Sequence, residues 1–458
     1  MAFKSNKFII TALVGIFIFL LTLSSSFLFY YLLFIVLGRI ICWKLASNKD
    51  EKKILLNLLY VVLPFYILFS FIIYQGYLLE NRFFIFSDQS FFYSNIEELV
   101  STSNSFYDVF KKTMIERIHY DYEGYFLLAG TAGYFAEYYL DGNNIFIQSI
   151  LVSSFSVLIN IYLIKILCFY IPRKKAYKYT LLFAFCSPIL YYSPWVLRDM
   201  PIALFYTIAF YLIHKKWNII NFFTFIGLIL ITMQFRTEHG LFLLVFPMIY
   251  TYLNKQKNYF INKIWPIIFS ITSVIFIYIF VLLIPQIEKS IKTVERYNKF
   301  TNESLNDGFG SKLYSLPPVI KEFALMVNSQ ITPLPPWVNL NLDYSWISLV
   351  MGLLTFIFAV FWSKVFLVTF FSFFNKSIRK KTPKIIYILL GIFFLFLLAN
   401  VSNINVRRLI AVYPIFFLIY VYIKESNFQN YFYKKYNQHA NLVYLTLIIL
   451  YISIKSIL

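Results

Sequence analysis

Ionisable residues at the edges of long apolar runs are the ones that could do chemistry in this chain. They occur in the strings FSDQSFF, SPWVLRDMP, FRTEHG and NVRRL. Arginine offers phosphate a planar, permanently charged fork with two hydrogen bonds, and an aspartate can take up a proton as a general base. Together they favour a reaction in which a phosphate is the leaving group, stabilised by arginine, while a base activates the incoming hydroxyl. The residues concerned are Asp88, Arg198, Asp199, Arg236, Glu238, His239, Arg407 and Arg408.

We predict distinct roles for these side chains. Asp88 is the candidate catalytic base, because one ionised carboxylate is enough for a single inverting displacement. Structural alternatives stay open: Asp88 as a helix cap, Arg198 and Asp199 as a simple ion pair, and Arg407 with Arg408 as an anchor at the membrane interface. The candidate ligands of a donor phosphate are Arg198, Arg236, His239, Arg407 and Arg408, supported by Asp199 and Glu238.

Metal and redox chemistry have weaker support. Asp121 and Glu123, in HYDYEG, could both contact a divalent cation. An acid-x-acid pair alone is a weak motif, so we predict no cofactor and keep the cation as an alternative. Cys42, Cys168 and Cys186 lie inside or at the ends of apolar runs, with a spacing that matches no zinc or redox motif. We expect them to be small buried hydrophobic residues.

Composition predicts the elements that position these residues. The chain has 458 residues, of which 60% are hydrophobic and only 14% are charged, whereas a soluble domain carries about 25% charged residues. This excludes a soluble enzyme, a disordered chain and a secreted disulfide scaffold. Apolar runs of about 20 residues predict an all-α polytopic membrane protein, one domain over 1–458. Thirteen spans are expected, or twelve if 8–43 is one bent element: 8–23, 27–43, 54–74, 143–170, 178–193, 200–213, 219–235, 240–253, 264–284, 346–375, 384–400, 409–423 and 442–456.

The distribution of charge predicts the orientation of these spans. Short connections such as 44–53, 173–178 and 376–384 are basic. Cytoplasmic loops are enriched in Lys and Arg, so the net charge of +20 indicates topology rather than nucleic-acid binding. Most acids fall in two long segments, 75–142 and 286–345, which we expect on the periplasmic or otherwise external side. The four charged strings fall on that side as well.

Both long external segments are predicted to be structured. In 286–345 the proline pairs at 317–318 and 335–336 indicate rigid turns. In 75–142 apolar residues recur largely at three- and four-residue steps, which predicts amphipathic helices in the membrane interface, with or without a role in substrate binding. These residues are Ile96, Leu99, Val100, Phe106, Phe110 and Met114, then Tyr122, Phe126, Ala129, Gly133 and Ala136.

The order of these features resembles the GT-C superfamily of membrane glycosyltransferases, over roughly 50–260. Asp88 matches the acidic residue that those proteins place early in their first external loop. HYDYEGYF is similar in layout to their His-Pro-Pro-Leu-Tyr-Tyr-like string but lacks its prolines. SPILYYSPWVLRDMPIALFY resembles their proline-rich turn, and FRTEHGLFLLVF resembles their positively charged turn. The second long segment with Arg407 and Arg408 also resembles O-antigen and capsule polymerases.

The resemblance implies an enzyme that transfers a hexose or an oligosaccharide. Its donor would be a polyprenyl-phosphate-linked or pyrophosphate-linked sugar, and its acceptor a saccharide. It would act at the periplasmic face of a bacterial inner membrane, in lipopolysaccharide O-antigen or capsule biosynthesis, with the lipid bilayer as partner. A repeat-unit polymerase is the alternative within this reaction class. A flippase for lipid-linked sugars is the alternative from another class, although the chain shows no repeated halves, and a scaffold would not need arginines in three external turns.

Overall fold

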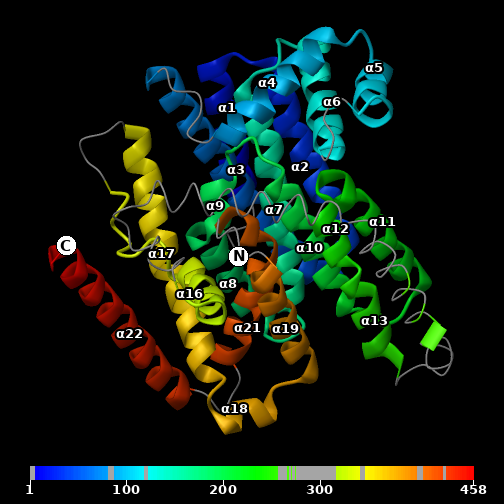
Figure 1. Cartoon of the computed structure of the whole chain (residues 1–458). Coiled ribbons are helices and arrows are strands. Elements are labelled where there is room, and N and C mark those ends of the chain that lie inside the picture. The colour runs from blue at the N-terminus through cyan, green and yellow to red at the C-terminus, as the bar shows by residue number, and fades with distance from the viewer. Residues whose placement is uncertain are drawn as a thin grey trace.

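A computed structural model describes residues 6–80, 87–117, 122–255, 266–267, 270, 274, 316–340, 346–399, 406–425 and 430–457 (Figure 1). These residues form helices and connections and contain no β-strand, which confirms the predicted all-α fold. Four helices are long and apolar enough to cross a membrane: α2 (Ser25–Leu45), α3 (Lys49–Glu80), α7 (Ile145–Leu167) and α17 (Trp346–Ser372). Shorter apolar helices accompany them, namely α1 (Asn6–Thr22), α10 (Asp199–Ile213), α11 (Ile219–Phe235) and α19 (Lys384–Ala399).

Described helices overlap the predicted spans, although 178–193 and 240–253 are each divided between two helices and 264–284 lies largely outside the described residues. The stretch 8–43 forms two helices and not one bent element. Leu23, with a φ of 50°, separates them, and the Ser24 hydroxyl caps α2 by accepting the backbone N–H of Phe27. The remaining spans correspond to α8 (Arg173–Cys186), α9 (Pro188–Tyr192), α12 (Thr237–Leu243), α13 (Val245–Lys255), α21 (Tyr413–Glu425) and α22 (Asn430–Ile457).

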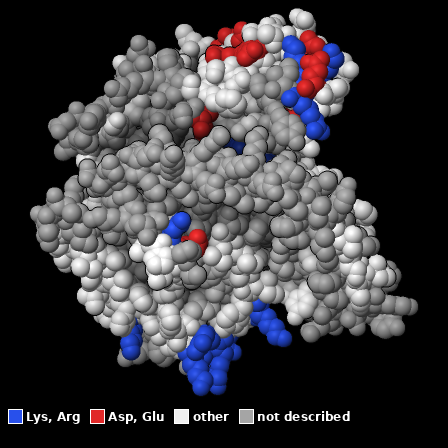
Figure 2. All heavy atoms as spheres, in the orientation of Figure 1, with Lys and Arg blue, Asp and Glu red and all other residues white. Residues whose placement is uncertain are grey.

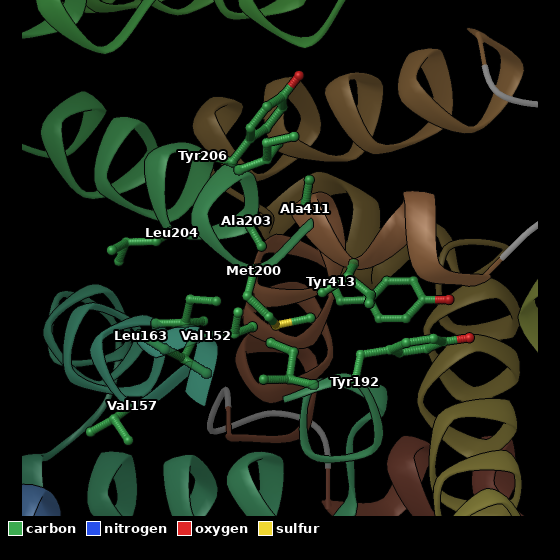
Figure 3. Close-up of a cluster of buried hydrophobic side chains, with 14 of the residues drawn as sticks. Val152, Val157, Leu163, Tyr192, Met200, Ala203, Leu204, Tyr206, Ala411 and Tyr413 are labelled. Carbon is green, nitrogen blue, oxygen red and sulfur yellow. The ribbon is translucent and has the colours of Figure 1, made fainter. Parts of the chain in front are cut away.

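Helix α7 forms the centre of the bundle. It is buried almost all round, because it packs against α2, α3 and α10. In Figure 3 the side chains of Val152, Val157 and Leu163 on α7 lie in the same apolar cluster as Met200 and Leu204 on α10. The start of α10 therefore has a fixed place, and with it the charged string that precedes the helix.

A buried ion pair joins α3 to α7 near the basic end of the bundle. Glu51 lies in the first turn of α3 and Lys165 in the last turn of α7. Their side chains are each only 6% exposed, and the Lys165 ammonium donates to the Glu51 carboxylate. The backbone N–H of Ser47 donates to the other carboxylate oxygen of Glu51 at 2.6 Å. Pairing compensates two charges that would each be costly to bury alone.

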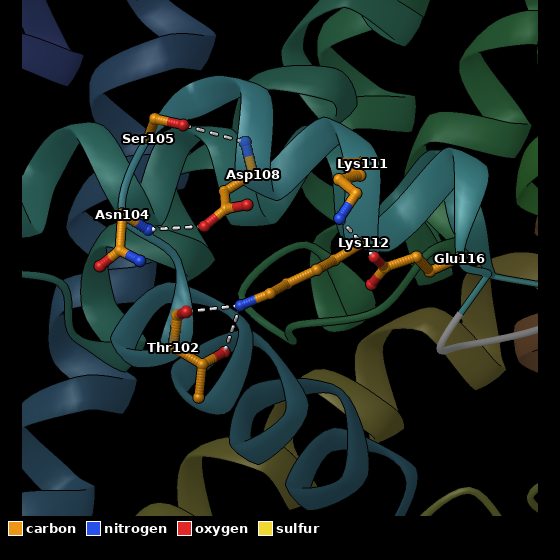
Figure 4. Close-up of polar contacts among 7 residues, drawn as sticks. All are labelled: Thr102, Asn104, Ser105, Asp108, Lys111, Lys112 and Glu116. Carbon is orange, nitrogen blue, oxygen red and sulfur yellow. Dashed lines mark hydrogen bonds and ion pairs between the residues drawn. The ribbon is translucent and has the colours of Figure 1, made fainter.

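Three helices and a π-helical turn form a cap at the opposite end: α4 (Ser87–Thr102), α5 (Phe106–Phe110), the π-helical turn Lys111–Ile115 and α6 (Glu123–Tyr139) (Figure 1). The apolar stripe of the first predicted amphipathic helix is divided between α4 and α5. Ser105 caps α5, and Lys112 reaches back to Thr102 across the break (Figure 4). Ile96 and Leu99 face the interior, whereas Phe106 and Phe110 are exposed. The cap thus presents aromatic side chains outward, as an interfacial element does.

Helix α16 (Pro318–Ile331), which belongs to the segment 286–345, packs against the helical bundle. Its buried Gln330 accepts a hydrogen bond from the Trp362 indole N–H at 2.9 Å. Trp362 lies 16 residues after Trp346 on α17, about 24 Å along the helix. Helix α16 therefore lies beside the middle of α17 (Figure 1). Residues 341–345 and most of 286–317 lie outside the described residues.

Charge differs between the two ends of the molecule. Figure 2 shows Lys and Arg side chains gathered at the end where α18 (Lys376–Lys381) lies. At the opposite end, acidic and basic side chains are mixed over the cap. This asymmetry is the one that the charge pattern of the sequence predicts for the two sides of a membrane.

Candidate active site

Arg407 joins two carboxylates from distant parts of the chain. Its Nη2 donates to Oδ2 of Asp88 at 2.5 Å, and its Nε lies 3.3 Å from Oδ2 of Asp199. Burial alone would lower the pKa of the Arg407 guanidinium, but Asp199 and Asp88 outweigh that effect and raise the pKa. Asp88, the turn with Asp199 and the turn with Arg407 therefore meet in one cluster. From the sequence, they could be predicted only to lie on the same side of the membrane.

Local structure explains where the two carboxylates stand. Asp88 lies in the first turn of α4, and Asp199 is the first residue of α10. Acidic side chains are favourable at these positions, because the helix dipole places partial positive charge at the N-terminus. Arg407 approaches from the short helix α20 (Val406–Leu409), which leads into α21 through the turn Ile410–Val412. The cluster thus lies where three elements begin.

Arg198 and Arg236 form a second cationic centre beside this cluster. Burial and the neighbouring Arg236 guanidinium lower the pKa of the Arg198 guanidinium to about 10. Arg198 donates from Nη1 to the backbone carbonyl of Phe235 at 2.8 Å, and it lies 4.0 Å above the ring of Tyr122. Arg236 faces Glu238 at 3.6 Å, but the Glu238 side chain is largely exposed. Two close, poorly hydrated guanidinium groups attract an anion.

An apolar cavity of about 980 Å³ lies next to the segment that carries Arg236, although neither Arg198 nor Arg236 lines it. Its walls come from α2, α3, the cap, α7, α10 and α11, and are almost entirely hydrophobic. Lining residues on α2 run from Phe29 to Ile41, which is about 18 Å of helix. The lining also includes Gln234 and Phe235, the two residues before Arg236. The cavity has room for a long apolar chain, and Phe235 in its lining contacts Arg198 through its backbone carbonyl.

A glycine allows the cap to close over this end of the cavity. A Cβ at Gly124, in the first turn of α6, would stand 2.8 Å from the Cβ of Gln234 and 2.9 Å from the Phe235 ring. Such distances are shorter than van der Waals contact. Gly124 is therefore required for α6 to approach α11, and this approach brings Tyr122 under Arg198.

Not all predicted site residues join the cluster. His239 is buried, and its ring packs against Tyr206 and Phe396, so its role as a phosphate ligand stays a prediction. Glu123 is buried as the first residue of α6. Asp121 lies outside the described residues, as does the side chain of Arg408 on α20. The described residues contain no group of three or more His, Cys, Asp or Glu side chains that could hold a metal ion.

Several aromatic and amide side chains at the site were not predicted. Tyr122 contacts Arg198, and Phe92 lies nearby on α4. Tyr125 is fully buried, and its hydroxyl has no hydrogen-bond partner within the described part of the chain. The amide nitrogen of Gln89, next to Asp88, likewise lacks one there. These residues lie close in sequence to Asp88 or within HYDYEG, which could have pointed to them. However, the chain is so rich in tyrosine and phenylalanine that its sequence does not distinguish site aromatics from the many others.

The site combines an apolar cavity, a pair of arginines at its edge and a carboxylate held by a third arginine. Such a set can bind an amphipathic anion, stabilise negative charge on a departing phosphate, and offer a carboxylate to a hydroxyl group. Comparisons of the chain with family models, with curated proteins and with solved structures each found no match.

Proposed function

We propose that this protein is a membrane glycosyltransferase with a polyprenyl-phosphate-linked or pyrophosphate-linked sugar donor. The observation that carries the proposal is the position of the Arg198–Arg236 pair beside an apolar cavity of about 980 Å³. Polyprenyl phosphates combine the same two properties, a long apolar chain and an anionic head. The Asp88–Arg407–Asp199 cluster supplies a carboxylate beside this anion site.

The reaction follows from these parts. The acceptor hydroxyl of a saccharide attacks the anomeric carbon of the donor sugar, and the bond from that carbon to the phosphate oxygen breaks. Asp88 takes the hydroxyl proton, and the phosphate leaves as an anion on the arginines. Because the leaving phosphate is stabilised by fixed positive charge, it needs no proton from a general acid. A single displacement inverts the configuration at the anomeric carbon.

The proposal places the site on the external side of a bacterial inner membrane. The basic end of the molecule, where α18 lies, would face the cytoplasm by the positive-inside rule. The cap and the charged cluster would then face the periplasm. Donors carried by lipid are available on that side, where lipopolysaccharide O-antigen and capsule are assembled.

Replacing Arg198 tests the donor site. We expect Arg198→Ala to lower sugar transfer by about 30- to 1,000-fold, since it removes a charge-assisted contact worth about 2–4 kcal/mol in a poorly hydrated site. Arg198→Lys should restore little activity, because lysine keeps the charge but loses the planar fork. The measurement uses purified protein, a defined lipid-linked donor and a labelled sugar. Arg379→Ala, on the exposed surface of α18, is the matched control and should keep full activity. Wild-type transfer by Arg198→Ala would contradict the assigned role.

The orientation can be tested by thiol labelling in intact cells. A cysteine at exposed Ser101 on α4 should react with a membrane-impermeant maleimide, whereas a cysteine at exposed Lys380 on α18 should react only after the membrane is opened. The unmodified chain reports any reaction of its own three cysteines. The reverse labelling pattern would place the site in the cytoplasm and overturn the proposal for a periplasmic donor.

A further inference from the structure

We propose that Asp88 and the phosphate of the donor compete for the same edge of Arg407, so that donor binding releases the Asp88 carboxylate to act as the base. This inference rests on the proposed function and specifies how its site is regulated. It makes the ion pair between Asp88 and Arg407 an exchangeable contact, and it makes Asp199 the residue that keeps Arg407 in place during the exchange.

The two carboxylates on Arg407 differ in accessibility. The Asp199 side chain is 8% exposed and faces Nε of Arg407, whereas the Asp88 side chain is 52% exposed and faces Nη2. The Asp88 carboxylate can therefore be hydrated by solvent when it leaves Arg407, whereas the Asp199 carboxylate would lose its partner in a buried position. Exposed ion pairs contribute little stability, and removing an anion from a buried guanidinium is much more costly. Exchange is thus favoured at Nη2 and disfavoured at Nε.

The surroundings allow Asp88 to move without its helix. The neighbouring Gln89 is fully buried, and Phe92 packs against Tyr122, Tyr125 and Phe126 of the cap. These contacts hold the start of α4. Release of Asp88 therefore needs only a rotation of its own side chain, which is a fast and small movement.

The entering phosphate would already be close to Arg407. Arg198 directly precedes Asp199, the partner of Arg407, and the cavity lining reaches Phe235, whose carbonyl accepts from Arg198. A headgroup held by Arg198 and Arg236 would thus lie next to the residue that holds Arg407. Displacing Asp88 at this moment couples the presence of the donor to the availability of the base.

Binding of short isoprenoid phosphates tests the competition separately from catalysis. Farnesyl monophosphate and farnesyl diphosphate are titrated onto the purified full chain in nanodiscs. We expect Asp88→Asn, which removes the competing anion but keeps its size, to tighten binding of one or both probes by about three- to tenfold. In an Arg407→Gln background the same substitution should have no effect, because the contested partner is gone. Asp108→Asn, at a half-buried acid in the first turn of α5 on the cap, is the matched control and should leave affinity unchanged.

The outcomes separate this inference from the proposed function. If Asp88→Asn leaves binding of both probes unchanged or weakens it, while Arg198→Ala weakens binding, the competition is refuted and the donor site stands. If neither probe binds the unmodified chain, both the donor site and the competition are refuted. Tighter binding by Asp88→Asn that persists in the Arg407→Gln background would also refute the inference. The tighter binding would then result from removing a negative charge near the anionic probe and not from a contest for Arg407.

Discussion

Asp88→Asn is expected to lower the rate of sugar transfer by about 10²–10⁴-fold. Asparagine has nearly the size of aspartate and keeps an oxygen that can accept from Arg407, but it cannot take up the proton of the acceptor hydroxyl. The loss should appear in turnover, because the proposed function assigns donor binding to Arg198 and Arg236. Together with the tighter binding expected from the competition at Arg407, this substitution should move affinity and turnover in opposite directions.

The assay for Asp88 needs separate measurements of transfer and binding. Transfer is followed with a defined lipid-linked donor and acceptor, and binding with the donor alone. Asp88→Glu should recover only part of the rate, because the additional methylene displaces the carboxylate by about 1 Å and positioning is sensitive at that scale. Wild-type turnover by Asp88→Asn would mean that another acid is the base, and Glu123 or Asp199 would then be tested next.

Lys165→Met is expected to lower the free energy of unfolding by about 3–5 kcal/mol, because it leaves the buried Glu51 carboxylate without its cation. Glu51→Gln should have a loss of similar size, since it leaves a buried ammonium. Replacing both residues, as Glu51→Leu with Lys165→Met, should restore most or all of the stability, because two packed apolar side chains carry no desolvation penalty.

Thermal unfolding of the purified protein in detergent measures these differences. Glu116→Gln is the matched control, because Glu116 pairs with Lys111 at 2.9 Å on the exposed surface of the cap (Figure 4), where an ion pair contributes about 0–1 kcal/mol. Equal stability of Lys165→Met and Glu116→Gln would show that the pair between α3 and α7 is not a structural requirement.

Much of the fold could be predicted from the sequence because apolar length is a strong signal in a membrane. The breaks near Arg198 and Arg236 were also foreseeable, since ionisable residues stand there between short apolar runs. The position of α16 beside α17 was not foreseeable. Its position depends on the pairing of Gln330 with Trp362, and a polar residue in a long connection gives no indication that its partner lies inside the bundle.

The sequence indicated which residues belong to the candidate site better than it indicated which of them contact one another. The charge pattern put Asp88 and Arg407 on one side, but their pairing depends on how α4 and α20 pack, which no local pattern records. The prediction that Arg407 binds phosphate stays a prediction, and its contacts with Asp88 and Asp199 were not foreseen. His239 and Arg236 belong to the same charged string, FRTEHG. Because His239 lies about one helical turn further along, its ring faces Tyr206 and Phe396.

The contact between Asp88 and Arg407 joins residues 319 positions apart. Chains are synthesised from the N-terminus, and their segments assemble in that order. The residues that line the cavity, together with Arg198 and Arg236, are therefore synthesised before Arg407. Under the proposed function, a donor that bound such a precursor would meet a carboxylate that Arg407 does not yet hold. Arrival of α20 then places a cation between Asp88 and Asp199. In the proposed enzyme, the step that restrains the base thus comes late in biogenesis, and a chain interrupted before Val406 would lack that restraint.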